Sequence, residues 1–225
     1  MNNKPLRVVR IVEGTSVDGP GLRTSIYFAG CAHRCPGCHN EHTWDFMSGK
    51  DMNIGEILET IRYNGFNVTF SGGDPLYQAE AILPLAMAIK EMGYTIWCYT
   101  GFTFEELLGD PVEGALKLLS VIDVLVDGPF EIDKKDTELI FRGSANQRII
   151  DVPRSLAIRM RYMDEDFVEH DEEFHGLKAW VIQHEYDHIE GIVFTDRISP
   201  LRRNLLKGKL MNLAKGKYRC AYKTK

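Results

Sequence analysis

The sequence predicts an α/β fold: a partial (β/α) barrel over residues 1–156, followed by a small α+β fragment over residues 157–225 with a central helix. In the first part, short β-rich runs alternate with helical patterns, which is typical of parallel strands joined by crossover helices. About five strands are too few to close an eight-stranded barrel, so we expect a partial one. The alternation stops at Leu156, and the join before it is short and carries Pro153.

The expected elements follow in chain order. Five β-rich runs predict strands at residues 7–12, 23–28, 67–70, 94–99 and 121–126. Between them, helical patterns predict helices at residues 54–63, 79–92 and 104–120, the last broken at Pro111. Asn53 with Glu56 three residues later predicts a capping box at the first helix. Beyond residue 157 we expect two strands joined by an acidic turn, then a helix ended by Gly191 and another ended by Gly216.

Four unusual loops follow predicted strands directly. A cysteine-rich loop follows TSIYF, SGGDP follows NVTF, CYTG closes YTIW, and DGPF follows VIDVLV. Ligands of open α/β sheets bind beyond the carboxyl ends of the strands. The four loops are therefore expected to share one rim and one active site.

Composition indicates an ordinary globular chain without membrane spans. Hydrophobic residues make up 44% and charged residues 26% of the 225 positions, and the net charge is −5. No apolar run approaches the ~18 residues that cross a bilayer. The N-terminus lacks the features of a secretory signal, so we expect the cytoplasm, where clustered cysteines more often bind metal than pair. From Leu201 onward nine basic residues occur without an acidic one; we interpret them as a solvated helix face and do not expect nucleic-acid binding.

The loop Gly30–Asn40, GCAHRCPGCHN, holds Cys31, Cys35 and Cys38 with the spacing C-x3-C-x2-C. Three thiolates can each bind one iron of a [4Fe–4S] cubane, which leaves the fourth iron without a protein ligand. An amine and a carboxylate of a small molecule can occupy that position. If the molecule is S-adenosylmethionine, an electron from the cluster can release a 5′-deoxyadenosyl radical. A zinc site completed by His33, His39 or His42 is the alternative.

The stretch SVDGPGLRTSIYFAGCAHRCPGCHNEHTWD resembles the signature of the glycyl-radical-enzyme activating family in the radical S-adenosylmethionine superfamily. Pro36-Gly37 before the third cysteine, SGGDP, and LIFRGSANQR resemble one branch, the activators of anaerobic ribonucleoside-triphosphate reductase. This resemblance covers about residues 5–156. Activators of pyruvate formate-lyase type enzymes are the alternative within the family.

The resemblance implies a barrel of the radical S-adenosylmethionine type, and a division of roles. The three cysteines would hold the [4Fe–4S] cluster, Gly72 and Gly73 would bind the methionine moiety of S-adenosylmethionine, and Gly37, Cys38 and His39 would line the adenine side. Asp74 is a partner for the ligand amine or a turn carboxylate that caps the next helix. Asp127 likewise has two possible roles, either contact with the ligand or a structural role in a turn. Cys98 is expected to be a buried hydrophobic residue.

The family reaction removes a hydrogen atom from a glycine Cα of a partner polypeptide. The resemblance therefore implies the large subunit of anaerobic ribonucleoside-triphosphate reductase as protein substrate. It also implies an external reductant of the flavodoxin type.

The helix expected around QHEYDHIEG contains His-Glu-x-x-His, which places His184 and His188 on one face, able to share an Fe²⁺ or Zn²⁺ ion. Glu185 beside them could act as general base. The surrounding sequence resembles the C-terminal part of peptide deformylase. Deformylase also needs a glycine-rich segment ending in glutamine and an EGCLS-type cysteine ligand, and neither motif occurs in this sequence.

Three interpretations remain open at this point. The first is a radical activating enzyme that carries an inactive deformylase remnant, whether by gene fusion or by a recombined reading frame. The second is a bifunctional enzyme whose helix finds a third metal ligand elsewhere. The third makes residues 157–225 a non-catalytic module that binds the ribosome or another partner.

Overall fold

The structure is a computed structural model that describes residues 5–109, 112–152, 157–175, 178–179, 182–183, 186, 189–190 and 211. The chain divides into two compact units, Met1–Trp180 and Val181–Lys225. Within the described residues, no helix is long and apolar enough to cross a membrane.

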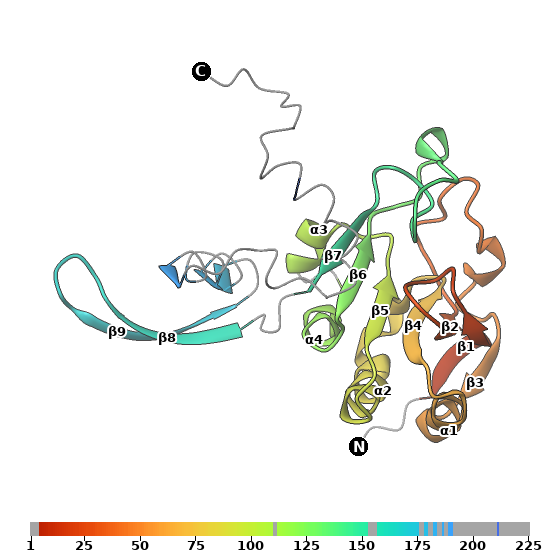
Figure 1. Cartoon of the computed structure of the whole chain (residues 1–225), viewed down its shortest axis with the longest axis horizontal. Coiled ribbons are helices and arrows are strands. Elements are labelled where there is room, and N and C mark those ends of the chain that lie inside the picture. Colours follow the sequence, from red (N-terminus) through yellow and green to blue (C-terminus); the bar gives the residue numbers. More distant parts are fainter. Residues whose placement is uncertain are drawn as a thin grey trace. The chain divides into compact units, whose positions relative to one another are not determined.

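The main feature of the first unit is a seven-stranded mixed sheet (Figure 1). Its spatial order is β3-β1-β2-β4-β5-β6-β7. Strands β2, β4, β5 and β6 are parallel to one another, whereas β1, β3 and β7 are antiparallel to their neighbours. The strand bounds are β1 Leu6–Thr15, β2 Arg23–Phe28, β3 Lys50–Met52, β4 Asn67–Gly72, β5 Ile96–Tyr99, β6 Val124–Asp127 and β7 Arg148–Asp151.

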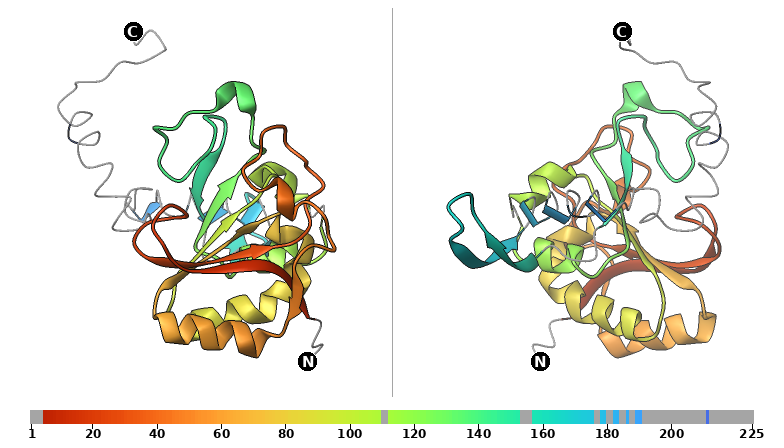
Figure 2. Two further views of the ribbon diagram at one scale, coloured as in Figure 1. Left: turned by 90° about the vertical axis from the view of Figure 1, so that its right-hand side faces the viewer. Right: turned by 60° about the vertical axis from the view of Figure 1, so that its left-hand side comes forward.

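Four helices connect the strands: α1 Ile54–Asn64, α2 Ala79–Glu91, α3 Phe104–Leu108 and α4 Ala115–Leu119. Helix α1 begins at the predicted capping box, in which Glu56 N donates to Asn53 Oδ1 over 2.9 Å and Asn53 N donates to Glu56 Oε2 over 3.0 Å. It ends at Gly65, whose left-handed φ of 67° suits a residue without a Cβ. Figure 2 shows α1 and α2 lying side by side beneath the sheet.

The main core lies between the sheet and these helices. Alternate strand residues, such as Ile26, Phe70 and Ile96, pack there against Ile61 and Leu85 of the helices, and all five are fully buried. Burial of each such side chain stabilises the fold by about 1.5–3 kcal/mol. A smaller cluster on the opposite face of the sheet contains Trp97, Val124 and Val126, with Tyr99, Phe141 and Ile149 packed against them. Because both faces are covered, every residue of β2 is buried.

The sequence-based expectations for this unit are confirmed in outline. An α/β arrangement with a large sheet is present, and β2 has the expected bounds. The helix expected at 104–120 with a break at Pro111 is indeed interrupted: α3 and α4 are separate short helices, and Gly114, with a φ of 83°, directly precedes α4. Two edge strands, β3 and β7, were not expected; both are short and antiparallel.

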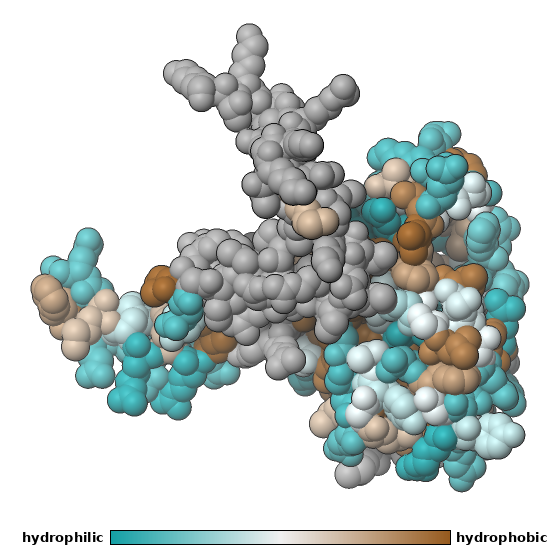
Figure 3. Space-filling view, in the orientation of Figure 1, coloured by the Kyte–Doolittle hydropathy of each residue, from teal (hydrophilic) through white to brown (hydrophobic). Residues whose placement is uncertain are grey.

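The two strands expected beyond residue 157 form a hairpin of β8 Ala157–Met163 and β9 Glu169–His175. Arg159 pairs with Asp171 across the strands at 2.7 Å, and His170 stacks on Tyr162. Phe167 and Val168 in the turn are exposed. Figure 3 shows tan and brown atoms among teal ones at that end of the hairpin.

Candidate functional site

The four loops singled out in the sequence lie at one edge of the sheet. Each follows a strand of the parallel group β2, β4, β5 and β6, so all four begin at the carboxyl ends of neighbouring strands. Backbone hydrogen bonds join them in turn. Gly73 N donates to Phe28 O over 2.8 Å, and Gly128 N donates to Phe102 O over 2.8 Å. The expected common rim is therefore present.

The cysteine loop is closed at its base by backbone hydrogen bonds. Gly30 N donates to Thr43 O over 2.8 Å, and Cys31 N donates to Trp44 O over 3.0 Å. Within the loop, Cys38 N donates to Cys35 O over 3.1 Å. These contacts fix a closed loop in which all three cysteines carry free thiols.

The surroundings of Cys31 and Cys35 favour the protonated thiol in the metal-free chain. Burial raises the pKa of Cys31 to about 11, and the negative charge of Asp74 adds to the rise. The backbone amides of His33 and Arg34 oppose it. Burial likewise raises the pKa of Cys35. Metal binding must therefore displace protons, and the positive charge of the metal would compensate the cost of forming thiolates here.

The donor set fits an iron–sulfur cluster better than a single metal ion. A mononuclear zinc site brings every sulfur to about 2.3 Å from one metal. Within the described part of the chain, no three His, Cys, Asp or Glu side chains are grouped to hold one ion. A cubane instead takes each thiolate on a different iron, which tolerates a wider spacing. The fourth described cysteine, Cys98, is fully buried in β5 as expected.

The two glycines of SGGDP are needed for packing against the end of β2. Gly72 has a φ of 104°, and a Cβ there would lie 2.5 Å from Phe28 N. A Cβ on Gly73 would lie 2.4 Å from Gly30 O. The loop is thereby brought directly against the start of the cysteine loop, which no side chain larger than hydrogen would permit.

Asp74 is a fully buried carboxylate that accepts several hydrogen bonds. Its Oδ1 accepts from Leu76 N over 3.0 Å, so the side chain caps the turn that follows. Its Oδ2 accepts from Thr100 Oγ1 over 2.8 Å and from Gly101 N over 2.9 Å. Of the two roles considered from the sequence, the capping role is therefore present. Its full burial gives no support to direct contact with a ligand amine.

The sequence suggested His33 only as a candidate zinc ligand, and the structure places it on the rim against Asp74 and Phe102. Its Nε2 lies 3.2 Å from Asp74 Oδ2, although not along a hydrogen-bond direction. The ring packs edge-on against Phe102, with centroids 4.4 Å apart, and also contacts Tyr77. A Cβ on Gly101 would meet the His33 ring at 2.5 Å, so this glycine makes room for the histidine.

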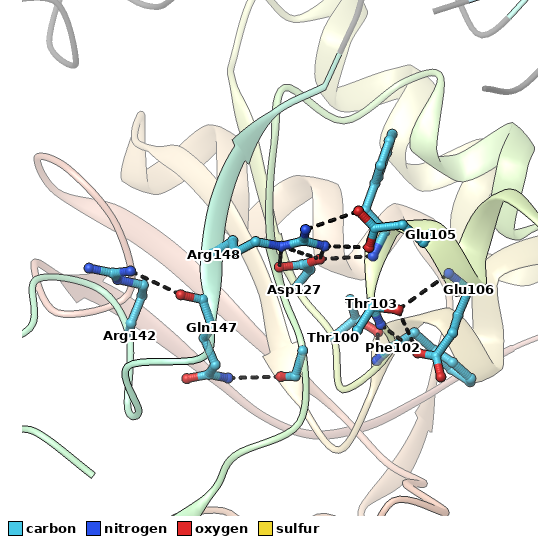
Figure 4. A network of polar contacts seen from close by, with 11 residues as sticks. Thr100, Phe102, Thr103, Glu105, Glu106, Asp127, Arg142, Gln147 and Arg148 are labelled. Atoms are coloured by element: carbon cyan, nitrogen blue, oxygen red, sulfur yellow. Dashed lines mark hydrogen bonds and ion pairs between the residues drawn. The ribbon is translucent and has the colours of Figure 1, made fainter. Parts of the chain in front are cut away.

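Asp127, at the end of β6, pairs with Arg148 in the network that Figure 4 shows, which also includes Thr100. It is almost fully buried, and its Oδ2 accepts from Phe104 N over 2.8 Å. Arg148 of β7 pairs with both Asp127 and Glu105, which raises the pKa of the guanidinium and lowers that of Glu105. The network fastens β7 and the start of α3 to β6, so Asp127 has the structural role that was the alternative to ligand contact.

The RGSANQ segment, residues 142–147, organises the loop between β6 and β7. Gln147 Nε2 donates to Gly128 O over 3.0 Å, and Asn146 Nδ2 donates to Pro129 O over 2.7 Å. This loop also reaches the third cysteine. Gly37 has a φ of 74°, and a Cβ there would lie 2.9 Å from Ile132 Cδ1. Glycine suits the position before Cys38 because its φ is left-handed and the Ile132 side chain lies close by.

The structure describes some of the remaining expected site residues but not others. Cys38 is half-buried, whereas Gly37 and His39 are exposed at the outer side of the cysteine loop. Their expected place beside an adenine ring stays a prediction. The helix residues His184, Glu185 and His188 lie outside the described residues.

Comparison with known proteins agrees with this geometry. A family model described as a 4Fe-4S single cluster domain matches residues 17–150, and one described as polypeptide deformylase matches residues 143–204. The anaerobic ribonucleoside-triphosphate reductase-activating protein of Pasteurella multocida (strain Pm70) is 37% identical over 143 residues, which is 59% of this chain and 89% of that protein. Its counterpart in Escherichia coli (strain K12) is 39% identical over 142 residues, with 58% of this chain and 89% of that protein covered.

Among solved structures, QueE from Escherichia coli aligns with a TM-score of 0.35 at 18% identity, covering 45% of this chain and 53% of that one. That likeness is too distant to add to the argument. The sequence matches are closer. The 4Fe-4S domain model spans more than half of this chain, and the matches to the two activating proteins span most of each relative. The chain therefore belongs to the family of anaerobic ribonucleoside-triphosphate reductase-activating proteins, through the 4Fe-4S single cluster domain of residues 17–150.

Proposed function

We propose that this protein is a radical S-adenosylmethionine enzyme that generates a glycyl radical on the large subunit of anaerobic ribonucleoside-triphosphate reductase. One observation carries the proposal: a C-x3-C-x2-C loop lies against the SGGDP loop at the carboxyl edge of the parallel strands, in a chain of the activating-protein family. A partial barrel of the radical S-adenosylmethionine type is the fold we infer for residues 1–156. The fragment from residue 157 is the second domain that we propose.

In this proposal, Cys31, Cys35 and Cys38 hold a [4Fe–4S] cluster. Bound there, the cluster would supply the low-potential electron for reductive cleavage of S-adenosylmethionine, which starts hydrogen abstraction from the partner's glycine. The chain holds the first thiol in a buried position, and the hydrogen bond from Cys31 N to Trp44 O fixes the backbone there. The more exposed Cys35 and Cys38 leave the other side of the loop accessible.

We assign Gly72 and Gly73 to the methionine moiety of S-adenosylmethionine, and Gly37, Cys38 and His39 to its adenine side. The support is proximity: Gly73 N donates to Phe28 O, three residues before Cys31. A ligand that chelates the iron without a protein ligand, in a cluster held beside Gly30 and Cys31, would therefore lie near the SGGDP backbone. The glycines present amides and carbonyls without a Cβ between them and the ligand.

We also propose a compartment, a reductant and a protein substrate. An oxygen-labile cluster held by reduced thiols suits the cytoplasm, and a flavodoxin-type protein is the reductant that we propose. Relatives named as activating proteins of the reductase suggest the protein substrate. Activation of a pyruvate formate-lyase type enzyme is the alternative target.

The deformylase match at residues 143–204 supports a second candidate function. His184 and His188 could share an Fe²⁺ or Zn²⁺ ion, with Glu185 as general base. Two histidines alone hold metal weakly, and the cysteine and glutamine motifs of deformylases do not occur in the sequence. We therefore propose that residues 157–225 are an inactive remnant, with a bifunctional enzyme as the alternative. A peptide deformylase assay with and without His184→Ala separates the two.

The test of the main proposal is anaerobic reconstitution of the full chain with iron and sulfide. We expect 5′-deoxyadenosine to form from S-adenosylmethionine under dithionite, and a glycyl electron-spin signal to appear on added reductase. A pyruvate formate-lyase type enzyme in place of the reductase should give no signal. Absence of 5′-deoxyadenosine from a protein with full iron content would reject the proposal.

A further inference from the structure

We infer that Asp74 is a positioning residue for S-adenosylmethionine binding: it holds the SGGDP loop, the cysteine loop and the loop after β5 in one arrangement, without touching the ligand itself. This inference rests on the proposed function. It assigns to Asp74 a role different from that of an amine ligand, and it extends the site to Thr100.

The first step is the position of Asp74 between loops. Its backbone N donates to Gly30 O over 2.8 Å, which ties it to the residue before Cys31. Its Oδ2 accepts from Thr100 Oγ1 and Gly101 N, both in the loop after β5. The His33 ring of the cysteine loop lies against the same oxygen, 3.2 Å away. One residue thus joins three loops of the rim.

The second step is that these contacts occupy the carboxylate. Asp74 is fully buried, with three hydrogen-bond donors shared between its two oxygens. A buried carboxylate is tolerated when such donors replace its hydration. Because the group is enclosed by its own protein, its effect on a ligand must pass through the loops that it holds.

The third step is that Thr100 carries the arrangement onward. Its Oγ1 donates to Asp74 and accepts from Phe102 N over 3.2 Å, and Phe102 O in turn accepts from Gly128 N. The Thr100 hydroxyl and Gly101 N therefore both join the loop after β5 to Asp74, and a backbone hydrogen bond continues the connection to the loop after β6. A displacement of about 1 Å at a binding loop can reduce catalysis by as much as 100-fold, so this link has a measurable effect on ligand binding.

The experiment compares two threonines of the same loop. Thr100→Val removes the hydroxyl that contacts Asp74 and keeps the side-chain shape. Thr103→Val removes a hydroxyl that only caps α3, where Glu106 N donates to Thr103 Oγ1. Each full-length variant is reconstituted with iron and sulfide. Iron content, thermal melting without the cluster, and the dissociation constant of S-adenosylmethionine, followed by the electron-spin signal of the reduced cluster, are then measured.

We expect both variants to bind iron like the wild type and to melt at similar, slightly lower temperatures. Thr100→Val should weaken S-adenosylmethionine binding about tenfold, whereas Thr103→Val should leave it within about twofold of the wild type. Asp74→Asn, if it folds, should weaken binding at least as much as Thr100→Val. An equal effect of the two threonine variants on binding would overturn the inference, because it would indicate only a general loss of stability.

Two further results would also contradict a positioning role. If Thr100→Val binds S-adenosylmethionine like the wild type while Asp74→Asn does not, Asp74 contacts the ligand directly. If neither variant changes binding, the network is structural only. Failure of the proposed function itself is distinguishable, because the wild-type protein would then show no response to S-adenosylmethionine.

Discussion

Asp74 and Asp127 occupy equivalent places in the topology and have different surroundings. Asp74 lies two residues after β4, Asp127 is the last residue of β6, and each is a buried carboxylate. Asp74 accepts hydrogen bonds from Thr100 Oγ1 and Gly101 N and lies against the His33 ring, whereas Asp127 pairs with the half-exposed Arg148. A position at the carboxyl end of a parallel strand therefore brings a carboxylate to the rim. Its hydrogen-bond and ion-pair partners then determine whether it holds the loops that we propose bind the ligand.

The largest effect is expected from variants that remove one of the three cysteine ligands. Cys31→Ser, Cys35→Ser or Cys38→Ser should each lose most of the about four irons per chain that a cubane contains, because each removes one thiolate ligand. Iron and acid-labile sulfide analysis after anaerobic reconstitution measures this loss. Cys98→Ala is the matched control, since Cys98 is buried in β5, and it should keep its iron. Retention of a full cluster by Cys31→Ser would contradict the assignment.

The next effect concerns the contact between SGGDP and β2. Gly72→Ala should lower the free energy of unfolding by about 3 kcal/mol or more, since it combines a left-handed φ with a clash against β2 backbone. Gly65→Ala is the control: its φ is also left-handed, at 67°, but a Cβ there meets nothing within 4 Å. It should cost only about 1 kcal/mol. Urea unfolding measures both, and equal costs would show that the close approach is not required.

Asp127→Asn sharpens the comparison of the two carboxylates. Removing the charge opposite Arg148 should cost about 1.5–3 kcal/mol of stability, the range for hydrogen bonds to charged groups. Cluster content and S-adenosylmethionine affinity should remain close to wild type, because the network holds β7 and α3 and does not include the cysteine loop. Thermal melting and ligand titration provide the two measurements. A loss of affinity equal to that of Asp74→Asn would remove the distinction between the two sites.

The smallest effect is a pH dependence of stability. Hydrogen bonds from Arg148 lower the folded-state pKa of Glu105, so the folded state favours the ionised carboxylate. The resulting stabilisation is present above the ordinary glutamate pKa of about 4.5 and is lost as the pH falls through the lowered value. Because Glu105 is largely exposed, we expect less than about 1 kcal/mol. Melting temperatures between pH 6 and 3 should fall less steeply in Glu105→Gln; an unchanged slope would exclude this contribution.

Much of the sheet was predictable because its chemistry is local. Strand β2 carries six buried residues in a β-rich run, and α1 begins at a capping box that two side chains specify. Strands β3 and β7 have three and four residues, and their pairing depends on neighbours that are distant in sequence. A short polar segment such as 50–52 gives no periodic signal, so these edges could not be derived from the sequence.

The site was predictable in part for a similar reason. Motif spacing identified the cysteines, the family resemblance identified the glycines of SGGDP, and the parallel order brought both loops to one edge. The roles of His33, Thr100 and Arg148 depend on contacts between loops that are far apart in the chain. No local pattern marks such residues, and the choice between two roles for Asp74 required its burial and its hydrogen-bond partners to be known.

The central claim is that three thiolates hold a cubane whose remaining iron is open to an exchangeable ligand. Electron-spin resonance of the anaerobically reconstituted, dithionite-reduced protein tests it most directly. We expect a [4Fe–4S] signal whose shape changes when S-adenosylmethionine is added. Zinc in place of iron at the three cysteines, or a cluster signal that S-adenosylmethionine leaves unchanged, would contradict the account.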